Sequence, residues 1–215
     1  PKDKVDIILT NPPFGGIEED GIEDNFPANY KTKETADLFL VLLMYKLKQT
    51  GRASIVLPDG FLFGEGVKTA IKEKLLSEFN LHTIVRLPNG VFAPYTGINT
   101  NLLFLERGTT QEIWFYEHQL PEGYKNYTKT KPIKLEEFEA EKAWWNSRKE
   151  TGCAWKVSID EIKARGYNLD FKNPNKESDS VLLSVDEIIN RLIESMHTTS
   201  NILEEIKGAM KNENG

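Results

Sequence analysis

A short polar and aromatic motif near the start of the sequence, Asn11-Pro12-Pro13-Phe14, combines groups that could do chemistry. It follows an apolar run, Val5–Leu9, which indicates a strand buried on both faces, as in a parallel sheet. Prolines cannot continue a strand ladder because they have no N–H to donate, and a residue before proline is held extended. The motif therefore predicts a rigid step at the carboxyl end of a strand, where open α/β sheets bind ligands. The step presents one amide side chain, two carbonyls that cannot pair as strand partners, and an aromatic ring.

This motif closely resembles the catalytic motif of the amino-group DNA methyltransferases, in the form typical of N6-adenine enzymes. The resemblance implies that the Asn11 side-chain oxygen and the Pro12 carbonyl accept hydrogen bonds from the adenine amine. The nitrogen lone pair would then point at the methyl group of S-adenosylmethionine. Pro13 would fix the step, and Phe14 would stack on a base flipped out of the helix. The alternative is a strand that ends in a proline-rich turn, with Phe14 in the core.

The elements that must position this motif alternate along the first half of the chain. We expect helices at 35–48 and 67–79, strands at 53–58, 82–88, 100–106 and 111–117, and a turn-rich connection at 61–66. Strand–helix alternation predicts a doubly wound α/β sheet. Strands 82–88 and 100–106 have no helix between them, which predicts an antiparallel hairpin. The fold class is therefore α/β, the C-terminal half of a Rossmann-like methyltransferase sheet, mostly parallel with an antiparallel edge hairpin.

Further stretches resemble the modification subunits of type I restriction–modification systems. They are Asp37–Leu40, Gly51–Gly60, Leu87–Phe92, Thr100–Phe104, Glu112–Tyr116 and Asn168–Asn175. The resemblance implies that Asn11 and Phe39 contact the cofactor, and that Phe92 or Tyr95 forms a second wall around the flipped base. Packing in the core is the alternative role for these aromatic residues.

One departure from that family concerns the cofactor. The glycine-rich loop and the acidic residue that binds the ribose are missing and would lie upstream of the motif. Together with the absence of an initiator methionine, this suggests a fragment. We expect the isolated fragment neither to methylate DNA nor to bind S-adenosylmethionine tightly.

The composition limits how the chain could meet DNA. Its net charge is −6, so contact must come from a local patch or from a partner. Lys125, Lys129, Lys131 and Lys134 lie close to Tyr124 and Tyr127 and could touch a nucleic-acid backbone, although a solvated linker is the preferred interpretation. Lys31 and Lys33 could meet phosphates or belong to a solvated loop. The histidines are scattered, which argues against a metal site.

The C-terminal segment carries a second informative pattern. A capping box at Ser184–Glu187 precedes apolar residues spaced by three and four, as in a coiled-coil seam. By the family resemblance, the helix 184–211 would bind the specificity subunit, and sequence reading would be delegated to that partner. Packing against the chain itself is the alternative. We divide the chain into residues 1–117, 118–180 and 181–215.

The sequence therefore predicts the modification subunit of a type I complex, a DNA N6-adenine methyltransferase. Its partners would be double-stranded DNA with a flipped adenine, a specificity subunit and, in some complexes, a restriction subunit. No membrane-spanning run or signal peptide is evident, and the single cysteine fits a cytoplasmic protein. The alternatives are a glutamine-N5 methyltransferase of release factors, whose motif usually ends in tyrosine, and a non-catalytic assembly module.

Overall fold

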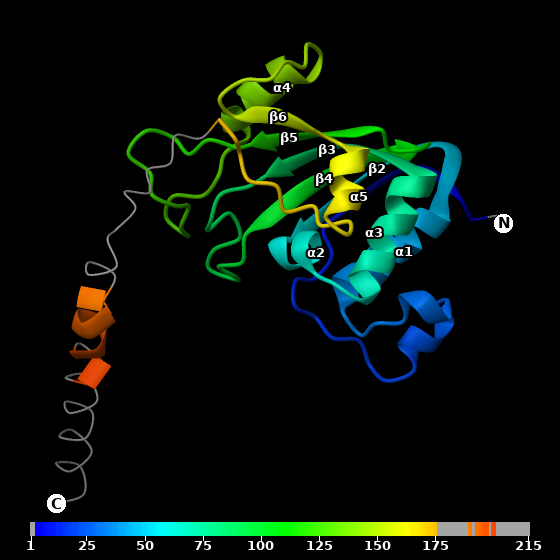
Figure 1. The fold of residues 1–215 in the computed structure, drawn as a ribbon, viewed down its shortest axis with the longest axis horizontal. Coiled ribbons are helices and arrows are strands. Elements are labelled where there is room, and N and C mark those ends of the chain that lie inside the picture. The colour runs from blue at the N-terminus through cyan, green and yellow to red at the C-terminus, as the bar shows by residue number, and fades with distance from the viewer. Residues whose placement is uncertain (1–2, 176–188, 191, 198, 201–215) are drawn as a thin grey trace, which may run out of the picture. The chain divides into compact units, whose positions relative to one another are not determined.

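The structure is a computed structural model that describes residues 3–175, 189–190, 192–197 and 199–200. The chain forms two compact units, residues 1–176 and 177–215. The strands of the first unit are β1 (Val5–Thr10), β2 (Leu47–Pro58), β3 (Phe79–Arg86), β4 (Thr100–Arg107), β5 (Glu112–Glu117) and β6 (Ala154–Ser158). Its α-helices are α1 (Thr35–Lys46), α2 (Asp59–Phe63), α3 (Val67–Glu78), α4 (Glu139–Trp145) and α5 (Ile159–Ala164) (Figure 1). Short 3-10 turns lie at Ile22–Asn25, Ala28–Tyr30 and Leu135–Phe138.

The six strands form one mixed sheet in the order β1-β2-β4-β3-β5-β6. The predicted antiparallel pairing of strands 82–88 and 100–106 is confirmed, with Ile84 opposite Leu103. The prediction that this hairpin forms the edge of a mostly parallel sheet is wrong. β4 lies inside the sheet because it pairs antiparallel with both β2 and β3, and β3 is itself interior because it also pairs in parallel with β5. Only β1·β2 and β3·β5 are parallel pairs, and β1 and β6 are the edges.

Strand β1 differs most from its expected environment. It was predicted to be buried on both faces, but Val5, Ile7 and Leu9 are 43%, 55% and 78% exposed. The reason is that the smaller core, which includes Trp144 of α4, contains no residue of β1, so Ile7 and Leu9 line an open hollow instead. Only its opposite face is partly covered, where Ile8 packs against the main core. Periodicity reports that a strand is apolar, but it cannot report which elements cover it.

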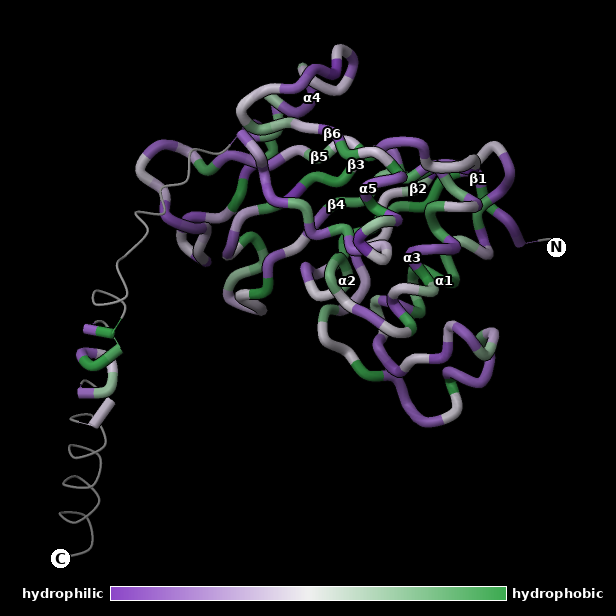
Figure 2. Tube along the Cα trace, viewed as in Figure 1, coloured by the Kyte–Doolittle hydropathy of each residue, from purple (hydrophilic) through white to green (hydrophobic). Residues whose placement is uncertain are grey.

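Helices cover the two faces of the sheet unequally. α1, α2, α3 and α5 lie on one face and α4 on the other (Figure 1). In the larger core, helix residues such as Leu40 and Leu75 pack against sheet residues such as Ile55. The strands of this core form the hydrophobic centre in Figure 2. A smaller core places Trp144 of α4 against Val85 and neighbouring residues of β3 and β5.

The local predictions were mostly correct in type and less so in length. The segment expected to be a turn-rich connection at 61–66 contains the end of the short helix α2, because Phe61 and Leu62 are buried and favour a regular packed turn. The segment after residue 134 forms a 3-10 turn that is followed directly by α4. The capping box at Ser158 and Glu161 is present and begins α5.

The second unit is described only in part. Residues 189–190, 192–197 and 199–200 are helical, and Ile189, Leu192 and Met196 are exposed. The remainder of the predicted helix 184–211 lies outside the described residues. Among the described residues, none of the helices combines the length and apolarity needed to cross a membrane.

Candidate active site

The predicted catalytic motif follows β1 directly. β1, β2, β3 and β5 run in the same direction, so their carboxyl ends lie along one side of the sheet, and the motif lies on this carboxyl-end edge. Pro12 is buried and anchors the step, whereas Asn11 is exposed. Among the described residues, the Asn11 side chain has no hydrogen-bond partner. Its amide is therefore free to bind a ligand at the end of the strand.

The structure brings two of the predicted base-binding residues together. The rings of Phe14 and Phe92 meet edge to face, with centroids 5.0 Å apart and planes at 75°. Phe92 belongs to the loop 88–99 between β3 and β4, so this contact joins two distant parts of the sequence. Tyr95 in the same loop is 92% exposed, and Phe39 on α1 is 38% exposed. In the described part of the chain, no ring contact links Tyr95 or Phe39 to the motif.

The residues just after the motif are fastened to the start of α1. The Thr35 N–H donates to the Gly16 carbonyl at 3.0 Å, and a Cβ at Gly16 would lie only 2.8 Å from Thr35 Oγ1. Glycine is therefore required for this close approach. Lys68 of α3 binds Glu34 and the buried Asp37 at 2.6 Å each. Burial raises the pKa of Asp37 despite this lysine.

A polar network behind the site was not predicted from the sequence. The buried Asn101 donates to Asp59 at 2.7 Å, and Arg86 lies 3.7 Å from Asp59 and 2.8 Å from Asp170. Burial alone would raise the pKa of Asp170, but Lys172 and Arg86 hold it below its usual value. The network ties the ends of β2 and β3 and the start of β4 to the segment after α5. The only feature of the sequence that could have indicated this network is that Asp59, Arg86 and Asn101 lie at or next to the ends of expected strands.

Two hollows lie along this edge. One, of about 530 Å³, is lined by residues including Asp59, Arg86, Pro88 and Asn99. The other, of about 320 Å³, is an open hollow formed by Leu9, Thr10, Asn11, Ser54 and Val56. Asn11 lines the smaller hollow, whereas Phe39 lines neither of the two. Within the described residues, no group of three potential ligands could hold a metal ion.

Comparison with known proteins identifies the family. The family model described as N-6 DNA Methylase matches residues 1–181. The chain belongs to this family. The match includes the predicted catalytic motif, the whole mixed sheet and the segment after α5.

The relatives in this family are considerably longer than the chain. The EcoEI type I methylase subunit of Escherichia coli is 60% identical over 195 residues, which are 87% of this chain and 40% of that protein. The EcoKI methylase subunit of E. coli K12 is 36% identical over 124 residues, 53% of this chain and 23% of that protein. The modification subunit assigned to a type I restriction enzyme of Vibrio vulnificus YJ016 has a solved structure, with a TM-score of 0.77 and 53% identity. It matches over 81% of this chain and 39% of its own.

Proposed function

We propose that this chain forms the catalytic edge of an S-adenosylmethionine-dependent DNA N6-adenine methyltransferase, the modification subunit of a type I restriction–modification complex. The single observation that carries the proposal is the arrangement at the end of β1. A free Asn11 amide stands on a buried proline, beside the edge-to-face pair Phe14 and Phe92. This arrangement supplies acceptors for an amine next to aromatic rings for a planar base. Family membership supports the adenine N6 position.

The proposed chemistry assigns each group a distinct role. The Asn11 side-chain oxygen and the Pro12 carbonyl accept the two N–H groups of the adenine amine and hold its lone pair toward the methyl donor. Phe14 and Phe92 contact the flipped base, and exclude water around it. S-adenosylmethionine supplies the methyl group when bound, and Asn11 and Phe39 are the residues of this chain that would contact it. Tyr95, which is exposed on the same loop, closes over the base from the outside.

Substitution of Asn11 tests the assignment in the complete methylase complex. Asn11→Ala should reduce methyl transfer to DNA by at least about 100-fold, because removing one preorganised hydrogen-bonding group typically costs that much. Assembly of the complex should be unchanged, since Asn11 is exposed and has no partner among the described residues. Asn146→Ala, at another exposed asparagine, is the matched control. Normal methyl incorporation by Asn11→Ala would rule out this catalytic role.

The partners of the proposed enzyme follow from the same family. Double-stranded DNA with a flipped adenine is the substrate, and residues 184–211, for which the sequence predicts a helix, bind the specificity subunit. A restriction subunit completes the complex in some systems. One solved chain similar to this one, with 41% identity and a TM-score of 0.77, comes from a study of complex assembly in the type I system. It supports the proposed assembly.

A glutamine-N5 methyltransferase is a weaker candidate. Its motif usually ends in tyrosine, whereas this chain has Phe14. A non-catalytic scaffold predicts that Asn11→Ala has no effect on methylation, so the same experiment separates that function from the proposed one.

A further inference from the structure

The segment 118–134, here called the lysine loop, leaves the sheet at the end of β5. It therefore begins at the same edge as the catalytic motif. In Figure 1 the lysine loop and the loop 88–99 both extend from the left-hand side, where the arrowheads of β3 and β5 point. Figure 2 colours much of the lysine loop as hydrophilic. The position of this loop is what a second contact surface for a large substrate would require.

The lysine loop carries a local excess of positive charge. Its lysines are Lys125, Lys129, Lys131 and Lys134, and all of them are exposed. None of these four forms an ion pair with the described residues. Four lysines within a ten-residue stretch are notable in a chain whose net charge is −6. Their charges remain available for an anionic partner.

Other lysines near the motif are already neutralised. Lys31 binds Asp24 at 2.6 Å, and Lys33 binds Asp20. The sequence left open whether these two contact phosphates or belong to a solvated loop. Their ion pairs lower the positive charge that they can offer to DNA. Among the lysines for which the sequence suggested phosphate contact, those of the lysine loop are therefore the ones that form no ion pair with the described residues.

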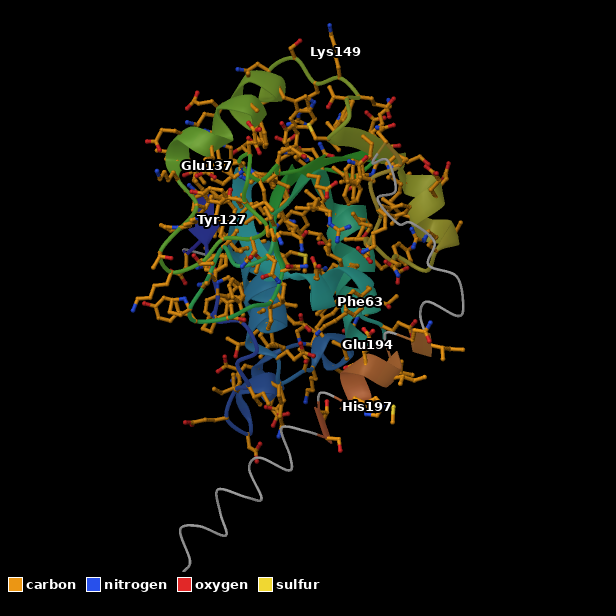
Figure 3. All side chains as sticks on the ribbon, turned by 90° about the vertical axis from the view of Figure 1, so that its left-hand side faces the viewer. Phe63, Tyr127, Glu137, Lys149, Glu194 and His197 are labelled. Carbon is orange, nitrogen blue, oxygen red and sulfur yellow. The ribbon has the colours of Figure 1, made fainter. Side chains whose placement is uncertain are left out.

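A buried tyrosine anchors the lysine loop to the loop that carries Phe92. Tyr127 has no exposed surface, and its N–H donates to the Asn89 carbonyl at 3.0 Å. Its hydroxyl donates to Glu137 and lies 3.1 Å from Nε2 of the buried His118. Figure 3 looks onto this edge and shows Tyr127 close to Glu137. The His118 Nδ1 in turn contacts Glu141 of α4.

Local turns hold the lysines on either side of this anchor. Thr128 and Lys131 exchange backbone hydrogen bonds of 3.0 and 3.1 Å, which makes a tight turn with Lys129 inside it. The Lys131 ammonium lies 5.1 Å from the centroid of the Tyr124 ring. A solvated linker would lack a buried anchor and paired turns of this kind. Because the loop is ordered in advance, it loses less conformational entropy on binding.

We propose that the lysine loop contacts the sugar–phosphate backbone of the DNA duplex whose adenine enters beside Phe14 and Phe92. This inference rests on the proposed function and locates part of its substrate surface. Lysines that meet phosphates hold the duplex in register without reading its sequence. The anchor at Tyr127 fixes the distance between the bound backbone and the base-binding loop.

The test measures DNA binding by the complete methylase complex, with a fluorescent duplex containing the target site, between 50 and 200 mM salt. The variant K125Q/K129Q/K131Q should weaken binding about 10- to 100-fold. The slope of the logarithm of the binding constant against the logarithm of the salt concentration should become smaller in magnitude by about 2 to 3, because each phosphate contact contributes about 0.9. The matched control is K4Q/K46Q/K163Q. It removes three lysines that also form no ion pair with the described residues. Lys4 and Lys46 lie at the amino ends of β1 and β2, away from the carboxyl ends where the motif lies. The control should bind like the wild type.

Each outcome separates this inference from the proposed function. If the triple variant binds DNA with wild-type affinity and salt slope while the wild type methylates, the lysine-loop proposal fails and the proposed function stands. If the variant weakens binding as expected but the wild type transfers no methyl group, the surface stands and the proposed function fails. The variant could instead assemble poorly with the other subunits, while the fraction that does assemble binds DNA normally. That result would mean that the loop contacts an acidic protein surface, and it would overturn the proposal.

Discussion

Lys72 shows at the scale of a single residue how the region behind the site is held. Its side chain is buried, and its ammonium donates to the carbonyls of Leu62 and Gly64 at 2.9 and 2.8 Å. Burial, with a smaller contribution from the charge of Lys68, lowers the pKa of Lys72 to about 8. The lysine binds two carbonyls at the end of α2, and the Leu62 carbonyl also accepts the Leu169 N–H at 2.9 Å.

The low pKa of Lys72 predicts a pH-dependent stability. Between about pH 8 and pH 10.4 the unfolded chain keeps the proton that the folded chain has lost, so the free energy of unfolding rises with pH in this window. Relative to Lys72→Met, the wild type should gain about 2 kcal/mol from pH 8 to pH 10. Urea denaturation at pH 8, 9 and 10 measures the difference, and Lys163→Met controls for the loss of one charge. A difference that stays constant with pH would contradict the assignment.

At the scale of elements, the loop 88–99 and the lysine loop act as one unit. Gly90 is the point of closest approach: its φ is +83°, and a Cβ there would lie 2.0 Å from the Tyr127 carbonyl oxygen. Nothing in the sequence indicated this contact with Tyr127. The placement of Phe92 therefore depends on a segment almost forty residues away in the chain.

Gly90→Ala should separate these two loops. The positive φ and the clash with backbone atoms should lower the free energy of unfolding by about 2 to 4 kcal/mol. Methyl transfer in the complete complex should fall with it, because Phe92 would move away from Phe14. Gly97→Ala in the same loop is the control, since a Cβ there meets nothing within 4 Å. Equal stability of the two variants, measured by urea denaturation, would show that the close approach is unimportant.

At the scale of the whole molecule, the chain combines the proposed catalytic motif with surfaces suited to further partners. The first unit exposes the apolar side chains of β1, and the described part of the second unit exposes Ile189, Leu192 and Met196 on a helix. Exposed apolar stripes of this kind are typical of helices that bind another helix. These residues belong to the predicted heptad seam, which supports the proposed contact with a specificity subunit.

Substitution within this seam tests that contact. Met196→Lys should weaken binding of the specificity subunit at least about tenfold, because it buries a charge in an apolar interface. Glu194→Lys is the control, since the heptad spacing places residue 194 on the opposite side of the helix. Co-purification or calorimetry with the specificity subunit gives the readout. If both variants bind equally well, the seam does not face that partner.

The sequence alone determined the local chemistry and much of the element order. The proline-terminated run before Phe14 marked the end of a strand, and the alternation of apolar runs placed the helices and strands on either side. Ser158 and Glu161 have the spacing of a capping box, which agrees with the observed start of α5. These features depend on neighbouring residues, so propensity and periodicity were sufficient to predict them.

Only the tertiary structure decided which distant groups meet. It placed β4 inside the sheet, left β1 as an exposed edge, and joined Phe14 to Phe92 and Tyr127 to Gly90. It also separated the paired Lys31 from the unpaired lysines of the lysine loop. Pairing, burial and charge neutralisation depend on long-range contacts, which a local pattern does not encode. For this reason the sequence predicted the reacting motif, while the fold located the surface that we propose presents the substrate to it.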